Sequence, residues 1–221
     1  MFRRSKGASS PLTNDEMIEQ QIIQRGITTP ILLDAFRQTD RREFVPEGQL
    51  ASAYLDQPVP LMPGATVSQP YIVALMTELL RTGPGQRVLE IGSGSGYQAA
   101  ILSLLAESIY CVEIQPELVE FSRQTLRRLG RNNIMIIAGN GWDGYPAAAP
   151  YDRIIVTAAP DSVPQQLLHQ LRPGGRMIAP IGAGPVQQLE VFDKSVTGEV
   201  SRSNHSPVQF VPLLRNSPPP I

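Results

Sequence analysis

The sequence contains very little of the residue types that form disulfides and metal sites. Its 221 residues include one cysteine and two histidines. An intramolecular disulfide is therefore excluded, and no recognisable set of metal ligands is expected. Cys111 lies in the apolar run of residues 109–112, which is typical of a buried strand rather than of a nucleophile. So little cysteine fits a reducing compartment, and we expect the chain in the cytoplasm.

The sequence also has almost no excess of positive or negative charge, and it has no long apolar run. The formal net charge is −1, so no broad positive surface for nucleic acid is predicted. No apolar run approaches the roughly 18 residues needed to cross a membrane. Residues 1–6 are basic but no apolar stretch follows them, so they do not resemble a signal peptide. We expect a monomer that binds neither nucleic acid nor membrane.

The length suits one α/β domain with a sizeable core. Residues 1–13 are predicted to be a disordered leader, and residues 216–221 a frayed tail. Between them, residues 14–215 are predicted to form a single domain. Its first part, 14–83, is interpreted as a helical and irregular cap, and its second part, 84–215, as a nucleotide-binding core.

Three helices are predicted in the cap. The first begins near Asn14, and the second is capped by Thr29 with proline at its first position. After an irregular, proline-punctuated stretch at 41–63, the third carries apolar residues at helical spacing from 72 to 80. Ser68 is a plausible N-cap for this helix, and that structural role is one interpretation of it.

From residue 88 onward, short apolar strands alternate with helical patterns. This alternation predicts a mostly parallel sheet with helices on both faces, a Rossmann-like α/β fold. The end of the chain predicts an antiparallel hairpin around residues 197–198. The expected strands cover 88–91, 109–113, 134–138, 151–157 and 176–181, and the expected helices cover 98–102, 116–130 and 163–171.

The turn after the first of these strands is the most informative stretch. Glycine occupies every second position there, with serine between: Gly92, Ser93, Gly94, Ser95 and Gly96. Glycine allows positive φ and lets a ligand approach the backbone closely. A dinucleotide fingerprint requires a further glycine where this chain has Tyr97, so that ligand class is disfavoured.

Glu90 precedes the first glycine of the turn. A carboxylate at the floor of the turn would repel a pyrophosphate but suits a ligand that carries an ammonium and a sulfonium. The pattern therefore predicts S-adenosylmethionine as the cofactor, bound as in class I methyltransferases. An ordinary strand-to-helix turn without a ligand is the alternative.

Polar residues also end the next two strands. Glu113, at the end of the second strand, is placed to accept both ribose hydroxyls, with Ile114 against the adenine ring. Asn140, followed by Gly141 after the third strand, can reach the adenine amino group through its amide oxygen. A simple Asn-Gly turn is an equally good interpretation of residues 140–141.

The end of the fourth strand bears on the substrate. Enzymes that methylate base amines tend to carry Asn/Asp-Pro-Pro-Tyr/Phe there, whereas this chain has Val-Thr-Ala-Ala-Pro at 156–160. Enzymes that methylate cytosine C5 need a thiol near that region, and Cys111 is on another strand. A nucleic-acid base is therefore disfavoured as the methyl acceptor.

Several motifs together resemble the protein-L-isoaspartate O-methyltransferase family over about residues 14 to 214, in the family's order and spacing. The most specific is Thr-x-Ser-Gln-Pro at 66–70. The others are Arg-Gly-Ile at 25–27, Phe-Val-Pro at 44–46, Ala-Tyr-Leu-Asp-Gln-Pro at 53–58, residues 90–100, 156–160, Gly-Gly at 174–175 and Phe-Val-Pro-Leu at 210–213.

The resemblance implies methylation of the isoaspartyl carboxylate in damaged proteins and peptides, with S-adenosylmethionine as methyl donor. The ester then collapses to a succinimide that reopens partly to normal aspartate. By resemblance, Ser68 hydrogen-bonds the substrate carboxylate, and Thr66, Val67 and Gln69 belong to the same segment facing substrate and cofactor. No catalytic histidine, cysteine or carboxylate pair is then expected.

One departure stands out, because the family has Gly-Asp-Gly where this chain has Gly-Asn-Gly at 139–141. The exchange would weaken cofactor binding by roughly 1 kcal/mol, since charge-assisted hydrogen bonds are about twice as strong as neutral ones. Two alternative functions stay open: an aspartyl methyltransferase that tailors a peptide natural product, and a non-catalytic module that binds S-adenosylmethionine.

Overall fold

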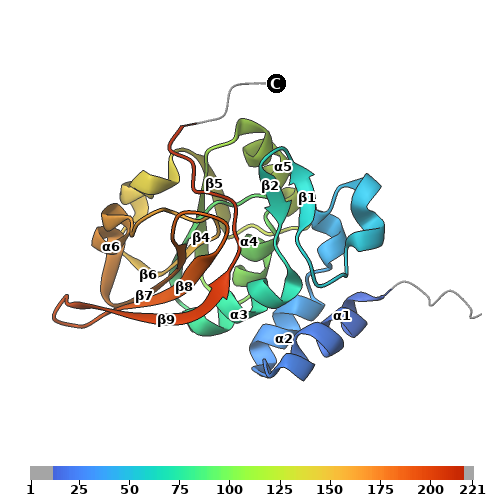
Figure 1. Cartoon of the computed structure of the whole chain (residues 1–221), viewed down its shortest axis with the longest axis horizontal. Coiled ribbons are helices and arrows are strands. Elements are labelled where there is room, and N and C mark those ends of the chain that lie inside the picture. The colour runs from blue at the N-terminus through green and yellow to red at the C-terminus, as the bar shows by residue number, and fades with distance from the viewer. Residues whose placement is uncertain (1–11, 217–221) are drawn as a thin grey trace, which may run out of the picture.

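A mostly parallel sheet is the frame of the molecule in the computed structural model, which describes residues 12–216. Its strands are β3 (Arg87–Ile91), β4 (Ser108–Glu113), β5 (Ile134–Ala138), β6 (Tyr151–Val156), β7 (Leu171–Ile181), β8 (Gln187–Lys194) and β9 (Val200–Val208). Their order across the sheet is β5-β4-β3-β6-β7-β8-β9 (Figure 1). The strands β3 to β7 pair in parallel, and β8 is antiparallel to both of its neighbours. This confirms the predicted sheet and its antiparallel end.

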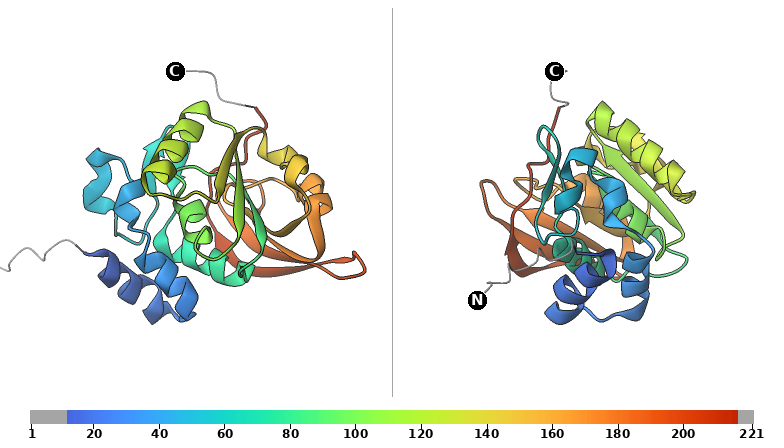
Figure 2. Two further views of the ribbon diagram at one scale, coloured as in Figure 1. Left: turned by 180° about the vertical axis from the view of Figure 1, so that it is seen from behind. Right: turned by 90° about the vertical axis from the view of Figure 1, so that its right-hand side faces the viewer.

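Helices cover both faces of the sheet, as predicted (Figure 2). On one face lie α3 (Pro70–Leu80), α4 (Tyr97–Leu102) and α5 (Pro116–Arg128). On the other lies α6 (Gln165–Gln170), with the short helices η4 (Gly141–Asp143) and η5 (Pro146–Ala148) nearby. Because β3 lies at the centre with β4 and β6 on either side, the loops that follow these strands meet at one edge of the sheet.

The N-terminal region adds small helices to the first of these faces. They are α1 (Asn14–Gln21), η1 (Ile23–Arg25), α2 (Pro30–Arg37), η2 (Arg41–Phe44) and η3 (Glu47–Ser52). The side chain of Thr13 accepts from the backbone of Glu16, and Glu16 reciprocates, so a capping box starts α1. Thr29 is the N-cap residue of α2, as predicted, but its side chain makes no capping hydrogen bond, and its hydroxyl donates to Glu78 at 2.8 Å.

The stretch predicted to be irregular ends in a small antiparallel hairpin, β1 (Val59–Met62) and β2 (Ala65–Val67), which the prolines concealed. The hairpin leads directly into α3. The N-cap of α3 is Gln69 with Pro70 at the first helical position, so the prediction that Ser68 caps this helix is wrong. The Ser68 side chain is therefore available for another role.

One hydrophobic core joins the N-terminal helices to the sheet. It runs from Met17 in α1 through Phe36 in α2 and Tyr97 in α4 to Val208 in β9. Within the described residues, no helix is long and apolar enough to cross a membrane. The predicted leader and tail lie almost wholly outside the described residues and stay predictions.

Candidate functional site: a pocket above the glycine turn

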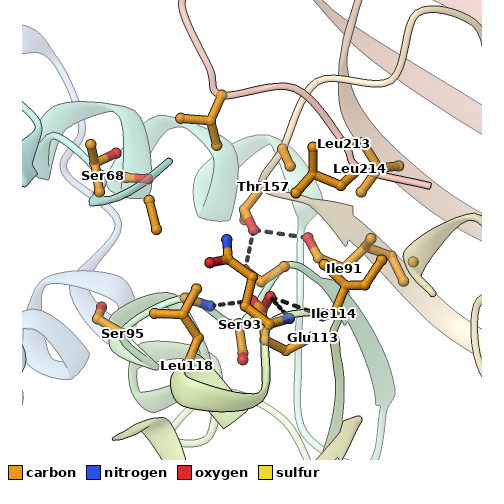
Figure 3. Close-up of a pocket in the computed structure, with 18 of the residues that line it drawn as sticks. Ser68, Ile91, Ser93, Ser95, Glu113, Ile114, Leu118, Thr157, Leu213 and Leu214 are labelled. Carbon is orange, nitrogen blue, oxygen red and sulfur yellow. Dashed lines mark hydrogen bonds between the residues drawn. The ribbon is translucent and has the colours of Figure 1, made fainter. Parts of the chain in front are cut away.

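A pocket of about 260 Å³ opens at the edge of the sheet where β3, β4 and β6 end. It is lined by the glycine turn, by residues 113–115 after β4, by Thr157 and Ala158 after β6, and by two segments from outside this sheet edge. Those two segments are residues 63–68 and residues 211–214. Figure 3 shows Ser68 from the first, Leu213 and Leu214 from the second, and Ser95 and Glu113 below them.

The glycine turn takes the backbone conformations that its sequence predicts. Gly92 has φ of 90°, and a Cβ there would come within 3.0 Å of the Thr157 hydroxyl. Gly94 has φ of 51° and faces open space toward Thr66. Side chains at these positions would strain the backbone or fill the pocket, so the glycines keep the floor of the pocket open. Gly96 begins α4 as its N-cap and does not line the pocket.

Glu113 binds the turn to the end of β4. One carboxylate oxygen accepts from the backbone N–H of Gly94 at 3.0 Å, and the other accepts from Ile114 at 2.9 Å and Gln115 at 3.0 Å (Figure 3). A carboxylate offers about four lone-pair sites, so capacity for a ligand hydroxyl remains. Ile114 and Leu118 form the apolar wall beside it.

Glu90 lies beneath the turn and is completely buried. Its Oε2 lies 3.7 Å from the thiol of Cys111, which donates to it, and its Oε1 has no hydrogen-bond partner among the described residues. Burial raises the pKa of Glu90 well above its ordinary value, and the nearby Glu113 carboxylate raises it further. A cation in the pocket would act in the opposite direction and favour the carboxylate.

The segment that carries Ser68 forms one side of the pocket. Thr66 and Ser68 line it, whereas Val67 is buried against Val59 in the β1–β2 hairpin and Gln69 serves as the N-cap of α3. No partner for the Ser68 hydroxyl is found among residues 12–216. The hydroxyl is therefore free to bind a ligand.

Asn140 is used locally and does not line the pocket. Its Oδ1 accepts from the backbone N–H of Trp142 at 3.0 Å, and its Nδ2 donates to the carbonyl of Arg215 at 3.1 Å. Gly141 does line the pocket, and a Cβ there would come within 2.5 Å of the Ile91 side chain. Whether Asn140 reaches a bound adenine stays a prediction.

Two contributors to the pocket were not predicted from the sequence. The hydroxyl of Thr157 lies 2.9 Å from the Ile91 carbonyl oxygen and 2.5 Å from that of Gly92, which holds β6 against the turn. Residues 211–214 reach the pocket because Val211 and Leu213 pair with Ala159, through backbone hydrogen bonds of 2.8 Å each. Both stretches stand in motifs of the resemblance, which was the available signal.

The chemistry of the lining fits a cationic, partly apolar ligand. Among the described residues that line the pocket, Glu90 and Glu113 have ionisable carboxyl groups and none is a lysine, arginine or histidine. Two buried polar atoms of lining residues, Glu90 Oε1 and Ser93 Oγ, have no hydrogen-bond partner among residues 12–216. Such a lining disfavours phosphates and suits the sulfonium, ammonium and adenosine of S-adenosylmethionine.

Solved structures define the class. A protein-L-isoaspartate O-methyltransferase matches with a TM-score of 0.82 and 30% identity, covering 90% of this chain and 65% of that one. A second, from Plasmodium falciparum, described as a protein-L-isoaspartate O-methyltransferase in complex with S-adenosyl-L-homocysteine, has a TM-score of 0.80 and 25% identity and covers 93% and 100%. The fold is that of a class I S-adenosylmethionine-dependent methyltransferase.

The sequence comparisons narrow this class. The family model described as Protein-L-isoaspartate(D-aspartate) O-methyltransferase matches residues 12–218. Protein-L-isoaspartate O-methyltransferases from Picosynechococcus sp. and Gloeobacter violaceus are 47% and 42% identical, covering 91% of this chain in both cases and 90% and 98% of the relatives. The chain therefore belongs to the protein-L-isoaspartate(D-aspartate) O-methyltransferase family.

Proposed function

We propose that the chain transfers a methyl group from S-adenosylmethionine to the carboxylate of isoaspartyl residues in proteins and peptides, and that Ser68 binds that carboxylate. Two observations together support this proposal: the family model matches residues 12–218, and the Ser68 segment lines the same pocket as the glycine turn. The two alternative functions considered from the sequence have no comparable support.

The cofactor would be held by the glycine turn and its two carboxyl groups. When bound, S-adenosylmethionine supplies a methyl carbon that its sulfonium already activates. Glu113 would accept from the ribose hydroxyls, and the positive charge of the bound cofactor would favour the ionised form of Glu90. Ile114 and Leu118 offer apolar surface to the adenine ring.

The chain's part in the transfer is to position the acceptor. A carboxylate with an ordinary pKa near ~4 is ionised at neutral pH, so no general base is required to activate it. The Ser68 hydroxyl would donate to one carboxylate oxygen and leave the other directed at the methyl carbon. Val73, Leu213 and Leu214 surround this region with apolar atoms, which excludes water and strengthens the hydrogen bond.

The test is transfer of labelled methyl to a matched pair of peptides that differ only in isoaspartate or normal aspartate. We expect base-labile label on the isoaspartyl peptide alone. In Ser68→Ala, kcat/KM should fall about 10- to 100-fold, because a hydrogen bond to a charged group contributes about 1.5–3 kcal/mol. Ser203→Ala, at an exposed serine of β9, is the control.

Label on neither peptide, with S-adenosylmethionine still bound, would overturn the proposed function. Label on both peptides would favour a general aspartyl methyltransferase. Full activity of Ser68→Ala would leave the reaction in place and reject the role of Ser68.

A further inference from the structure

Arg41 is a charged side chain buried outside the pocket that the proposed mechanism does not use. It is 0% exposed and is the first residue of η2, in the N-terminal region that precedes Ser68 along the chain. Its guanidinium donates to four backbone carbonyls: those of Ala53, Gln57 (3.2 Å), Val67 (3.3 Å) and Ser68 (2.9 Å).

These carbonyls belong to two separate parts of the chain. Ala53 and Gln57 lie in the turn after η3, and Val67 and Ser68 lie at the junction of β2 and α3. The planar guanidinium presents its N–H groups in a fixed fork, so Nη1 binds the first part while Nη2 reaches both. Arg41 therefore connects the Ser68 backbone to a second segment that is 11 to 15 residues away along the chain.

The charge of Arg41 is compensated by these carbonyls rather than by a direct ion pair. No carboxylate of the described residues lies within 4.0 Å of its guanidinium. Removing the Arg41 guanidinium would leave these carbonyl oxygens without their donor, and the bonds to Ala53 and Val67 are fully buried. The arrangement thus holds the backbone at 67–68 in one position.

The guanidinium also contacts the other half of the pocket. Its central carbon lies 5.9 Å from the ring centroid of Tyr97, which directly follows the glycine turn and lines the pocket. Phe36 and Phe44 pack against the same ring, at 6.2 and 5.3 Å between centroids. Arg41 therefore lies between the Ser68 segment and the start of α4.

We propose that Arg41 is a positioning residue for methyl transfer, which fixes the Ser68 hydroxyl relative to the glycine turn by holding the carbonyls of Val67 and Ser68. This inference rests on the proposed role of Ser68. Misplacement of a reacting group by about 1 Å costs on the order of 100-fold in rate. Loss of Arg41 should therefore lower kcat/KM while the affinity for cofactor changes little.

A double-mutant cycle with Arg41→Met and Ser68→Ala tests this inference. In a chain that keeps Ser68, we expect Arg41→Met to lower kcat/KM for an isoaspartyl peptide about 10- to 100-fold. In a chain that already carries Ser68→Ala, the same substitution should lower kcat/KM less than about threefold. The dissociation constant of S-adenosylhomocysteine, measured by calorimetry, should change less than about threefold in either background.

Arg131→Met is the matched control, because Arg131 also donates to a backbone carbonyl, that of Gln38 at 2.9 Å, but makes no hydrogen bond to Val67 or Ser68. Arg41→Lys keeps the charge without the fork and should show a smaller loss with the same coupling to Ser68→Ala. If Arg41→Met does not fold, Arg41→Lys takes its place in the double-mutant cycle. In the Arg41 variants, amide hydrogen exchange relative to the wild type should increase more at residues 65–69 than in α5.

Equal losses from the Arg41 variants in both Ser68 backgrounds would overturn the inference, because they would show a general structural effect. An inactive wild-type chain would reject the proposed function instead. A fully active Ser68→Ala variant would reject the role of Ser68 and with it the positioning role of Arg41.

Discussion

Glu90 illustrates how one residue of the site opposes stability in favour of function. Its carboxyl group is completely buried on the central strand β3, and one of its oxygens has no partner among the described residues. Burial raises its pKa, so folding disfavours the ionised form of this carboxyl group. This cost is acceptable if the same carboxyl group later meets a cationic ligand.

The pH dependence of unfolding tests this effect. Because the folded pKa of Glu90 is raised, its contribution to stability is greatest below the ordinary pKa of 4.5 and declines as pH rises toward the folded value. We expect the free energy of unfolding of Glu90→Gln, minus that of the wild type, to increase from about pH 4 to about pH 8. Urea titrations at several pH values would measure it.

The matched control is Glu47→Gln, at an exposed glutamate of η3. Its difference from the wild type should be nearly independent of pH. A flat profile for Glu90→Gln as well would show that Glu90 ionises normally in the folded chain.

At the scale of elements, the site depends on how the C-terminal segment, residues 211–215, is attached. The indole N–H of Trp142 in η4 donates to the carbonyl of Leu213 at 3.3 Å, and the guanidinium of Arg215 lies 3.8 Å above the Trp142 ring. Together with the hydrogen bonds to Ala159, these contacts hold Leu213 and Leu214 over the pocket.

Trp142→Phe removes the indole donor and keeps an aromatic ring for Arg215. We expect the dissociation constant of S-adenosylhomocysteine to rise about 3- to 10-fold, because one net hydrogen bond contributes about 1 kcal/mol. Isothermal titration calorimetry would measure it.

Tyr151→Phe is the control for this variant. It loses a hydrogen bond of 2.6 Å to the Tyr145 carbonyl, and neither tyrosine lines the pocket. It should lower stability without changing affinity. Equal affinities of Trp142→Phe and the wild type would show that the C-terminal segment is held without Trp142.

At the scale of the whole molecule, the N-terminal helices and the sheet share one core. Phe36 of α2 is fully buried and packs edge to face against Tyr97 of α4, at 6.2 Å between ring centroids. The sole tryptophan, Trp142, lies on the other face of the sheet and reports on the distant part of the molecule. The shared core predicts that both parts unfold together.

Phe36→Ala tests this cooperativity. We expect the free energy of unfolding to fall by about 3–5 kcal/mol, the usual effect of removing a buried phenylalanine side chain. The Trp142 fluorescence and far-UV circular dichroism transitions should shift together. Ile31→Ala, on the same helix at a side chain that is 50% exposed, should have a small effect. A tryptophan transition that stays unshifted would show that the N-terminal region unfolds separately.

The features that the sequence predicted correctly are those encoded by neighbouring residues. The strand bounds at 134–138 agree with the structure, and the glycine turn takes the predicted positive φ. Capping signals were only partly correct, because Thr29 is the N-cap of α2 without a capping side-chain hydrogen bond, and Gln69 rather than Ser68 is the N-cap of α3. The β1–β2 hairpin was missed because proline at 60 and 63 is uncommon in strands.

By itself, the sequence determined the alternation of strands and helices, the glycine turn and the acidic residue that ends β4, since period and turn chemistry depend on adjacent positions. Only the tertiary structure decided that Thr157 and residues 211–214 converge on one pocket and that Arg41 binds the backbone of Ser68 beside it. Their roles depend on contacts between residues that are far apart along the chain. Such contacts leave no local pattern, because they are selected by packing of the whole core.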